Sequence, residues 1–212
     1  MSRFLVRAAL ALNVLILGGC SAIFKPSEPM ISPPVKLFAV LPLKRVDVSL
    51  EPQAVGVEVE QAAAPDAERV VTAQIYAVMA ESSTWRFVPD LQVEQAMRDV
   101  HAAELEARAL QLGKVVKADG VFYGTVSRFR ERDGSEYGAR HGASVSFRLA
   151  LVSVETGATV WEGRFDQTQQ ALSSNLLDWW MFWEAGPKWV SARELSHLGV
   201  EQLLGQLRVR LP

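Results

Sequence analysis

Few side chains in this sequence are suited to covalent chemistry, and the most distinctive is the thiol of Cys20. It is the only cysteine among 212 residues, so an internal disulfide, a multi-cysteine zinc site and a redox thiol pair are excluded. His101, His141 and His197 lie far apart in the sequence and show no ligand spacing. No G-x-S-x-G, P-loop, G-x-G-x-x-G or H-E-x-x-H motif occurs. We therefore expect no catalytic residue, no metal site and no cofactor, and a protein that is not an enzyme.

The residues before Cys20 indicate what its thiol does. Arg3 and Arg7 form a basic start, and a ten-residue run follows over Ala8–Leu17 that is apolar except for Asn13. Such a run spans about 15 Å as a helix, half of the ~30 Å that a transmembrane helix must cross. Leu17-Gly18-Gly19-Cys20 resembles the lipobox that lipoprotein signal peptidase reads. The alternatives are an ordinary secretory signal or a short anchor, and neither needs a cysteine at this place.

The lipobox resemblance implies that residues 1–19 are a signal peptide and that Cys20 becomes the lipidated amino terminus. Each buried CH₂ contributes about 0.8 kcal/mol, so two or three acyl chains on one cysteine anchor a protein stably. In lipoproteins, a residue such as Ser21 after the cysteine usually implies transfer to the outer membrane. Residues 20–34 combine this cysteine with a tether that contains four prolines and reaches about 43 Å at ~3.1 Å per residue.

The charge of the chain argues against nucleic acid as a partner. The full sequence has 22 basic and 24 acidic residues. Without residues 1–19, which hold Arg3 and Arg7, 20 basic and 24 acidic residues remain, for a formal charge of −4. Nucleic-acid-binding domains carry a basic face, which this balance does not indicate. Residues 35–212 are long enough for one well-buried periplasmic domain.

Strand and helix patterns alternate along that domain. Val35–Leu43 is an apolar run typical of a buried strand, and Asp66–Ser82 has one apolar face at helical spacing. From Asp119 the period changes to two, and the 155–158 turn predicts a hairpin. Ser191–Glu194 forms a capping box that opens a last helix. The expected strands are 35–43, 85–88, 119–130, 143–154 and 159–166, and the expected helices are 66–82, 93–100, 102–117, 171–184 and 191–209. Residues 47–65 are expected to be irregular. This order predicts an α/β fold in which helices pack on a mixed sheet.

Three segments resemble one group of periplasmic proteins. Leu37–Pro42 resembles a "VAVLPF" strand, Lys117–Val126 is similar to "ADxVVxGxV", and Leu149–Trp161 resembles the hairpin "LxLVDxxTGxxVW". The group comprises the TolB amino-terminal domain, the CsgG secretion lipoprotein and the LpoB activators of peptidoglycan synthases. The resemblance implies a TolB-amino-terminal or CsgG-like fold and a periplasmic, non-catalytic protein that binds other envelope proteins. Gly120 and Gly124 are expected where two backbones approach closely.

This resemblance leads us to expect an outer-membrane accessory or assembly factor of an envelope complex. LpoB-like activators have long linkers, whereas the tether here is short. CsgG-like pores need membrane-spanning hairpins, and the only candidate, Arg128–His141, carries the charged run Arg130–Asp133. The rival interpretations are an oligomeric subunit of a CsgG-like secretion channel and an envelope enzyme of unrecognised type. The expected partners are the membrane, through the Cys20 lipid, and either another envelope protein or a second copy of the chain.

Two segments are candidates for a binding surface. Arg128–His141, between two strands, is either a solvated hairpin loop or a recognition loop. Leu176–Trp189 holds four of the six tryptophans, and its apolar residues surround the expected helix. These residues either pack within the monomer or contact a partner, an oligomer or the membrane surface. Tryptophan dominates interface hot spots, so the candidate interface residues are Trp179, Trp180, Phe182, Trp183 and Trp189.

Overall fold

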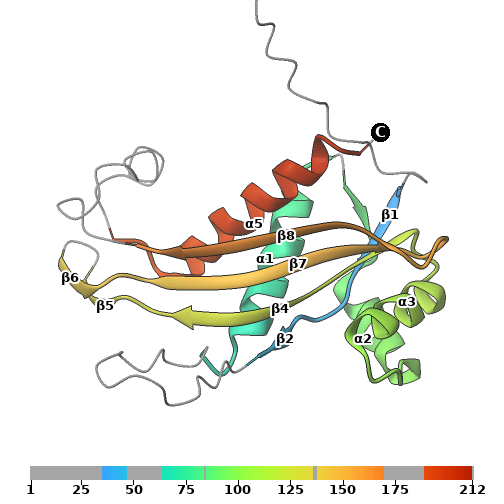
Figure 1. Cartoon of the computed structure of the whole chain (residues 1–212), viewed down its shortest axis with the longest axis horizontal. Coiled ribbons are helices and arrows are strands. Elements are labelled where there is room, and N and C mark those ends of the chain that lie inside the picture. Colours follow the sequence, from blue (N-terminus) through green and yellow to red (C-terminus); the bar gives the residue numbers. More distant parts are fainter. Residues whose placement is uncertain (1–34, 47–63, 84, 136–137, 170–188, 212) are drawn as a thin grey trace, which may run out of the picture.

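The computed structural model describes residues 35–46, 64–83, 85–135, 138–169 and 189–211, which form a mixed sheet with helices on both faces (Figure 1). The main sheet has six strands in the order β3-β1-β4-β7-β8, and β2 also pairs with β4. The strands of this sheet are β1 (Leu37–Val40), β2 (Lys44–Arg45), β3 (Arg86–Phe87), β4 (Gly120–Arg130), β7 (Ser144–Ser153) and β8 (Thr159–Thr168). The helices are α1 (Ala67–Glu81), α2 (Asp90–Ala96), α3 (Leu105–Val116) and α5 (Ala192–Arg208), with a 3₁₀ turn at Met97–Asp99.

The sheet is parallel on one side of β4 and antiparallel on the other. β1 runs parallel to both β3 and β4, whereas β4, β7 and β8 form an antiparallel meander. β1 and β2 follow the same edge of β4, where Phe38 pairs with Gly120 and Lys44 with Thr125. Pro42 lies between them and has no backbone N–H to donate, which accounts for the interruption.

The helices divide between the two faces of the sheet. α1 and α5 pack side by side on one face, while α2 and α3 cover the other face where β4 begins (Figure 1). Because side chains alternate along a strand, Phe38 and Val40 enter the core beneath α1 and α5. Ala39 and Leu41 enter the second core, beneath α2 and α3. One continuous run of apolar residues thus serves both layers, as the sequence predicted for a buried strand.

The fold class expected from the sequence is confirmed, including most element positions. The capping box is formed: the Glu194 N–H donates to Ser191 Oγ at 3.1 Å, and the Ser191 N–H donates to Glu194 Oε2 at 2.7 Å. The expected close approach at Gly124 is also present, since a Cβ there would lie 2.1 Å from the Arg148 carbonyl oxygen. Residues 47–63 and the helix expected at 171–184 lie outside the described residues.

Two expectations about local structure were wrong. The sequence predicted no strand at Lys44–Arg45, yet these two residues pair with β4 as β2. β4 ends at Arg130 as expected, but the rest of the segment Arg128–His141 is not simply a loop, because two short strands follow, β5 (Asp133–Ser135) and β6 (Gly138–His141). In both places pairing with a neighbouring strand, which is absent from local propensity, determines the backbone.

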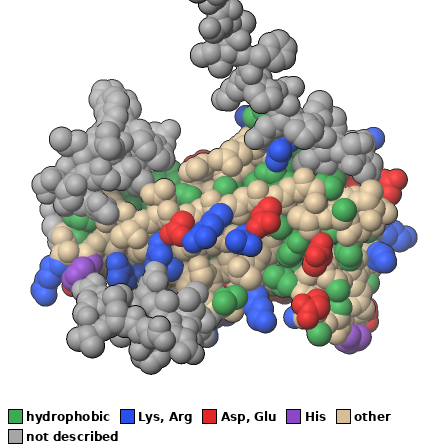
Figure 2. All heavy atoms as spheres, in the orientation of Figure 1, with side chains coloured by type: hydrophobic (Ala, Val, Ile, Leu, Met, Phe, Trp, Pro, Cys, Tyr) green, Lys and Arg blue, Asp and Glu red, His purple; other side chains and the backbone are tan. Residues whose placement is uncertain are grey.

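The face of β7 and β8 turned away from α1 and α5 carries paired charges. Figure 2 shows basic and acidic side chains alternating across it. Arg148 lies 3.0 Å from Glu162, and Arg164 lies 2.6 Å from Asp166, which also pairs with Arg128. Exposed pairs of this kind contribute little stability individually. They leave this face polar and close to neutral, which is typical of a solvated sheet surface.

Candidate functional site

A pocket of about 320 Å³ lies between α1, the end of β1 and α2. Its floor is apolar, and its walls carry carboxylates, two hydroxyls and one guanidinium. We call it the acidic pocket. Its lining residues are Val40, Pro42, Leu43, Glu68, Arg69, Thr72, Ala73, Tyr76, Asp90, Val93 and Glu94.

Helical spacing on α1 builds the long wall of the acidic pocket. Glu68, Thr72 and Tyr76 follow one another at intervals of four residues and so share one face of the helix. Thr72 Oγ1 donates to the Glu68 carbonyl at 2.7 Å and accepts the Leu43 N–H at 3.1 Å. This second bond ties the chain after β1 to α1. The floor of the pocket is therefore held at a set distance from its wall.

Two residues that line the acidic pocket each have a buried polar atom without a hydrogen-bond partner among the described residues. Within the described part of the chain, neither Glu68 Oε2 nor the Tyr76 hydroxyl makes a hydrogen bond, although both atoms are buried. Leaving a buried polar group unpaired costs about 1–3 kcal/mol, and more for a charged one. Because the side chains of Glu68 and Tyr76 line the pocket, it is suited to a ligand that donates hydrogen bonds to them.

The electrostatics of the acidic pocket favour a cation. Glu68, Asp90 and Glu94 outnumber Arg69, the only basic residue in the lining. Burial raises the pKa of the Tyr76 hydroxyl above its ordinary value, and the negative charges of Asp90 and Glu94 raise it further. Tyr76 therefore stays neutral at physiological pH. An ammonium, guanidinium or amide group is the donor that this arrangement accepts best.

The lining offers binding groups but no catalytic set. It contains no histidine, cysteine or serine. Thr72, the one aliphatic hydroxyl in the lining, already takes part in two hydrogen bonds. The groups that the acidic pocket offers for binding are carboxylates, two hydroxyls and one guanidinium.

The sequence-predicted site residues fall mostly outside the described residues. Cys20 and the candidate interface residues Trp179, Trp180, Phe182 and Trp183 all lie there. Trp189 is described: it is half-buried, and its ring lies against Gly142, between β6 and β7. No helix among the described residues is long and apolar enough to cross a bilayer. The interface role of the tryptophans stays a prediction.

Two residues of Arg128–His141, the segment considered as a recognition loop, hydrogen-bond the backbone at the start of α5. The Arg132 guanidinium donates to the Trp189 carbonyl at 2.6 Å, and Glu131 Oε2 accepts the Ala192 N–H at 3.1 Å. A carboxylate at the first turn of a helix also interacts favourably with the helix dipole. The charged run 130–133 therefore has a structural role within the chain.

Sequence reasoning missed both the acidic pocket and a cluster formed by Glu81, His197 and Glu201. The four-residue spacing of Glu68, Thr72 and Tyr76 was visible, but the second wall, at Asp90 and Glu94, comes from a different helix. His197, which showed no ligand spacing to the other histidines, is half-buried, and its ring hydrogen-bonds Gln74 at 2.8 Å. Neither site follows from spacing within a single segment.

The comparison with protein families supports the resemblance drawn from the strand and turn motifs. Residues 66–166 match the family "Peptidoglycan-synthase activator LpoB". This range runs from the start of α1 into β8 and includes all lining residues of the acidic pocket except Val40, Pro42 and Leu43. This range of the chain is therefore similar to the LpoB family. No curated protein matches the chain at the sequence level.

Several solved structures are similar to this chain at low identity. The PelC dodecamer from Paraburkholderia phytofirmans has 15% identity and a TM-score of 0.45, over 88% of this chain and 94% of that one. Lipoprotein GNA1162 from Neisseria meningitidis has 18% identity and a TM-score of 0.44, over 70% and 91%. The LpoB C-terminal domain from Escherichia coli has 15% identity and a TM-score of 0.41, over 64% and 84%.

Proposed function

We propose that this chain with an LpoB-like domain is an outer-membrane lipoprotein, anchored through Cys20, that binds a peptidoglycan synthase as a non-catalytic accessory factor. The observation that carries the proposal is the match of residues 66–166 to a family of peptidoglycan-synthase activators. That match includes most of the acidic pocket, where we place the docking point. A binding role agrees with a lining that has acceptors and carboxylates but no nucleophile paired with a base.

The occupant we propose for the acidic pocket is a lysine or arginine side chain of the partner. Its aliphatic stem fits the apolar floor at Val40 and Val93, and its charged end reaches Glu68 and Tyr76. Binding would then bring a hydrogen-bond donor to two side chains whose buried polar atoms have no partner among the described residues. A buried contact of this kind in the centre of an interface is where binding energy usually concentrates.

The proposed lipid anchor limits how far from the membrane this chain can bind its partner. The tether after Cys20 has 14 residues, 21–34, and an extended chain of this kind reaches about 43 Å at ~3.1 Å per residue. The domain therefore stays within that distance of the membrane that holds the lipid. A synthase bound at the acidic pocket must extend a basic segment into this layer.

Site-specific crosslinking in intact cells tests both partner and place. A photo-crosslinking amino acid replaces Ala73, an exposed lining residue of α1, and adducts are identified by mass spectrometry. We expect an adduct with a peptidoglycan synthase, and we expect Glu94→Lys to reduce it at least about tenfold by placing a like charge opposite the basic group. Glu155→Lys, on the turn between β7 and β8, is the matched control and should leave the adduct unchanged.

The remaining outcomes separate the rival functions. Adducts only between copies of this chain would favour an oligomeric channel subunit and contradict the synthase proposal. A synthase adduct that is equally strong in the Glu94→Lys variant would support the synthase as the partner but contradict docking at the acidic pocket. Adding the purified chain to the captured synthase and measuring its polymerisation rate then distinguishes an activator from a passive ligand.

A further inference from the structure

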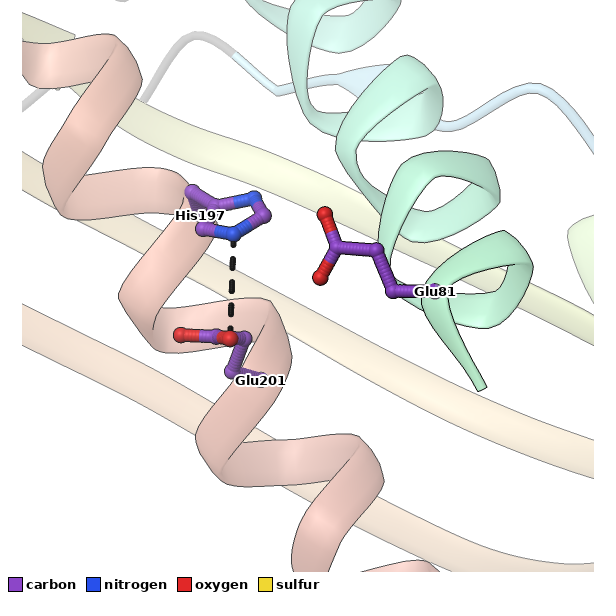
Figure 3. Close-up of side chains that lie close together, drawn as sticks. All are labelled: Glu81, His197 and Glu201. Atoms are coloured by element: carbon purple, nitrogen blue, oxygen red, sulfur yellow. Dashed lines mark ion pairs between the residues drawn. The ribbon is translucent and has the colours of Figure 1, made fainter. Parts of the chain in front are cut away.

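The packing of α1 against α5 brings three potential metal ligands together. Glu81 is the last residue of α1, and His197 and Glu201 lie one turn apart on α5. Their ligand atoms all lie within 4.8 Å of one another. Figure 3 shows the Glu81 carboxylate pointing from α1 towards the imidazole and Glu201 below it on the same helix as the histidine. The three side chains therefore converge from two helices on one small volume.

One nitrogen of the His197 ring, Nδ1, already has a hydrogen-bond partner. His197 Nδ1 lies 2.8 Å from the Gln74 side-chain oxygen, which can only accept a hydrogen bond. Nδ1 therefore carries the proton in the neutral ring, and the Nε2 lone pair is available. An outer N–H that donates to an oxygen is the arrangement found around most metal-binding histidines, because it fixes the tautomer and the ring orientation.

Nε2 faces the carboxylates without a hydrogen bond to them. It lies 3.7 Å from Glu201 Oε1, beyond ordinary hydrogen-bond distance. The ligand atoms of one tetrahedral ion lie somewhat closer together than 3.7 Å. Small rotations of the exposed Glu81 and Glu201 side chains would bring all three ligand atoms close enough to bind one ion. The half-buried histidine, at 30% side-chain exposure, is the fixed member, and the two glutamates are the adjustable ones.

We propose that Glu81, His197 and Glu201 bind a divalent transition-metal ion of the zinc class. One imidazole nitrogen and two carboxylates suit Zn²⁺, whereas Ca²⁺ and Mg²⁺ prefer sets made only of oxygen. Three protein ligands leave one position of a tetrahedral ion for water. The ion fastens the end of α1 to the middle of α5. This site is independent of the acidic pocket and of the proposed synthase partner.

Zinc titration of the full chain in detergent tests the site. After treatment with a chelator, the protein is titrated with Zn²⁺ by calorimetry, and Co²⁺ is used as a spectroscopic probe of coordination. We expect one Zn²⁺ per chain, a higher Tm in its presence, and no comparable effect of Ca²⁺ or Mg²⁺. A Cys20→Ser background removes the only thiol as a competing ligand.

Matched variants decide whether these residues hold the ion. His197→Gln, Glu81→Gln and Glu201→Gln should each weaken zinc binding at least about tenfold, and Gln74→Leu should weaken it about 10- to 100-fold through the lost outer hydrogen bond. His141→Gln is the control, because His141 lies 3.8 Å from Asp133 in an exposed pair outside this three-ligand group. Zinc bound equally well by His197→Gln, or weakened equally by His141→Gln, would overturn the proposal, as would the absence of binding to the unaltered chain.

Discussion

Asp119 and Leu37 exchange hydrogen bonds in both directions. The Leu37 N–H donates to Asp119 Oδ2 at 2.8 Å, and the Asp119 N–H donates to the Leu37 carbonyl at 2.9 Å. The same carboxylate oxygen also accepts the Lys36 N–H at 3.1 Å. The aspartate of the Ala118-Asp119-Gly120 motif thereby fixes where the first strand meets β4. A residue that the sequence marked only through a family motif has a specific structural role.

Replacing Asp119 with alanine should destabilise the domain by about 1 to 2 kcal/mol, because two backbone N–H groups lose a charged acceptor at an exposed site. Urea unfolding measures the change. Asp119→Asn is the matched control, since its amide oxygen still accepts these bonds, and it should lose less. Equal stability of the alanine variant and the unaltered chain would contradict this role.

Two glycines should respond to alanine in opposite directions. At Gly124 the added Cβ would meet the Arg148 carbonyl oxygen at 2.1 Å, and a backbone atom in a paired strand cannot easily move. We expect a loss of about 2 to 3 kcal/mol or failure to fold. At Gly205 in α5 nothing lies within 4 Å, so alanine should stabilise the helix by up to about 1 kcal/mol. Thermal unfolding of both variants tests the pair, and similar Tm values would refute it.

The Asp166 carboxylate should make stability depend on pH at the acid end. Burial raises its pKa, but hydrogen bonds from Arg164 and Arg128 outweigh this and hold the pKa below the ordinary 3.8. A depressed folded pKa stabilises the domain above pH 3.8, and this contribution is lost as the pH falls through the lower folded value. Asp166→Asn should therefore be less stable at neutral pH, with a difference that shrinks below pH 3.8. Glu162→Gln, from the exposed pair with Arg148, is the control and should change stability less.

Replacing Cys20 with serine should block lipidation and leave unprocessed precursor, because a hydroxyl is a far weaker nucleophile than a thiolate. Metabolic labelling with a fatty acid, followed by cell fractionation, measures both effects. Ser21→Ala serves as the control and should still be labelled. Label that persists on the Cys20→Ser protein would exclude this residue as the acylation site.

Exchanging Trp179 and Trp183 for glutamine distinguishes a tryptophan interface from a tryptophan core. If the residues form an interface, the fold should persist and partner capture should disappear. If they are core residues, the change should cost about 3–5 kcal/mol per truncated side chain, a large part of the ~5–15 kcal/mol that stabilises a domain. Thermal melting and crosslinking of the same variant separate the two results. Normal melting together with full partner capture would rule out both roles.

The strands and helices were predictable where their signals are local. The apolar run at 35–43, the capping box at Ser191 and Glu194, and the turn at Gly157 each specify backbone geometry through neighbouring residues. β2 was not predictable in this way. Lys44 and Arg45 have no strand pattern, and they are extended because β4 presents an edge beyond Pro42.

The binding sites were less predictable than the fold because each joins separate segments. His197 and Glu201 have the spacing of one helical turn, but the third ligand, Glu81, comes from a helix more than a hundred residues earlier. The wall of the acidic pocket formed by Asp90 and Glu94 likewise depends on where the fold places α2 relative to α1 at the end of β1. Only the tertiary packing brings these charges together.

The position of β1 between β3 and β4 has a consequence for how the chain is made. A ribosome produces β1 first, yet Phe38 pairs with Phe87 and Gly120, which emerge only much later. Until then the apolar run 37–43 is an unpaired strand, the kind of segment that aggregates unless it is covered. The antiparallel β4-β7-β8 meander, with its local contacts, can form before β1 docks. Until β4 is available, the first strand of the chain therefore lacks both of the strands that cover its edges in the folded domain.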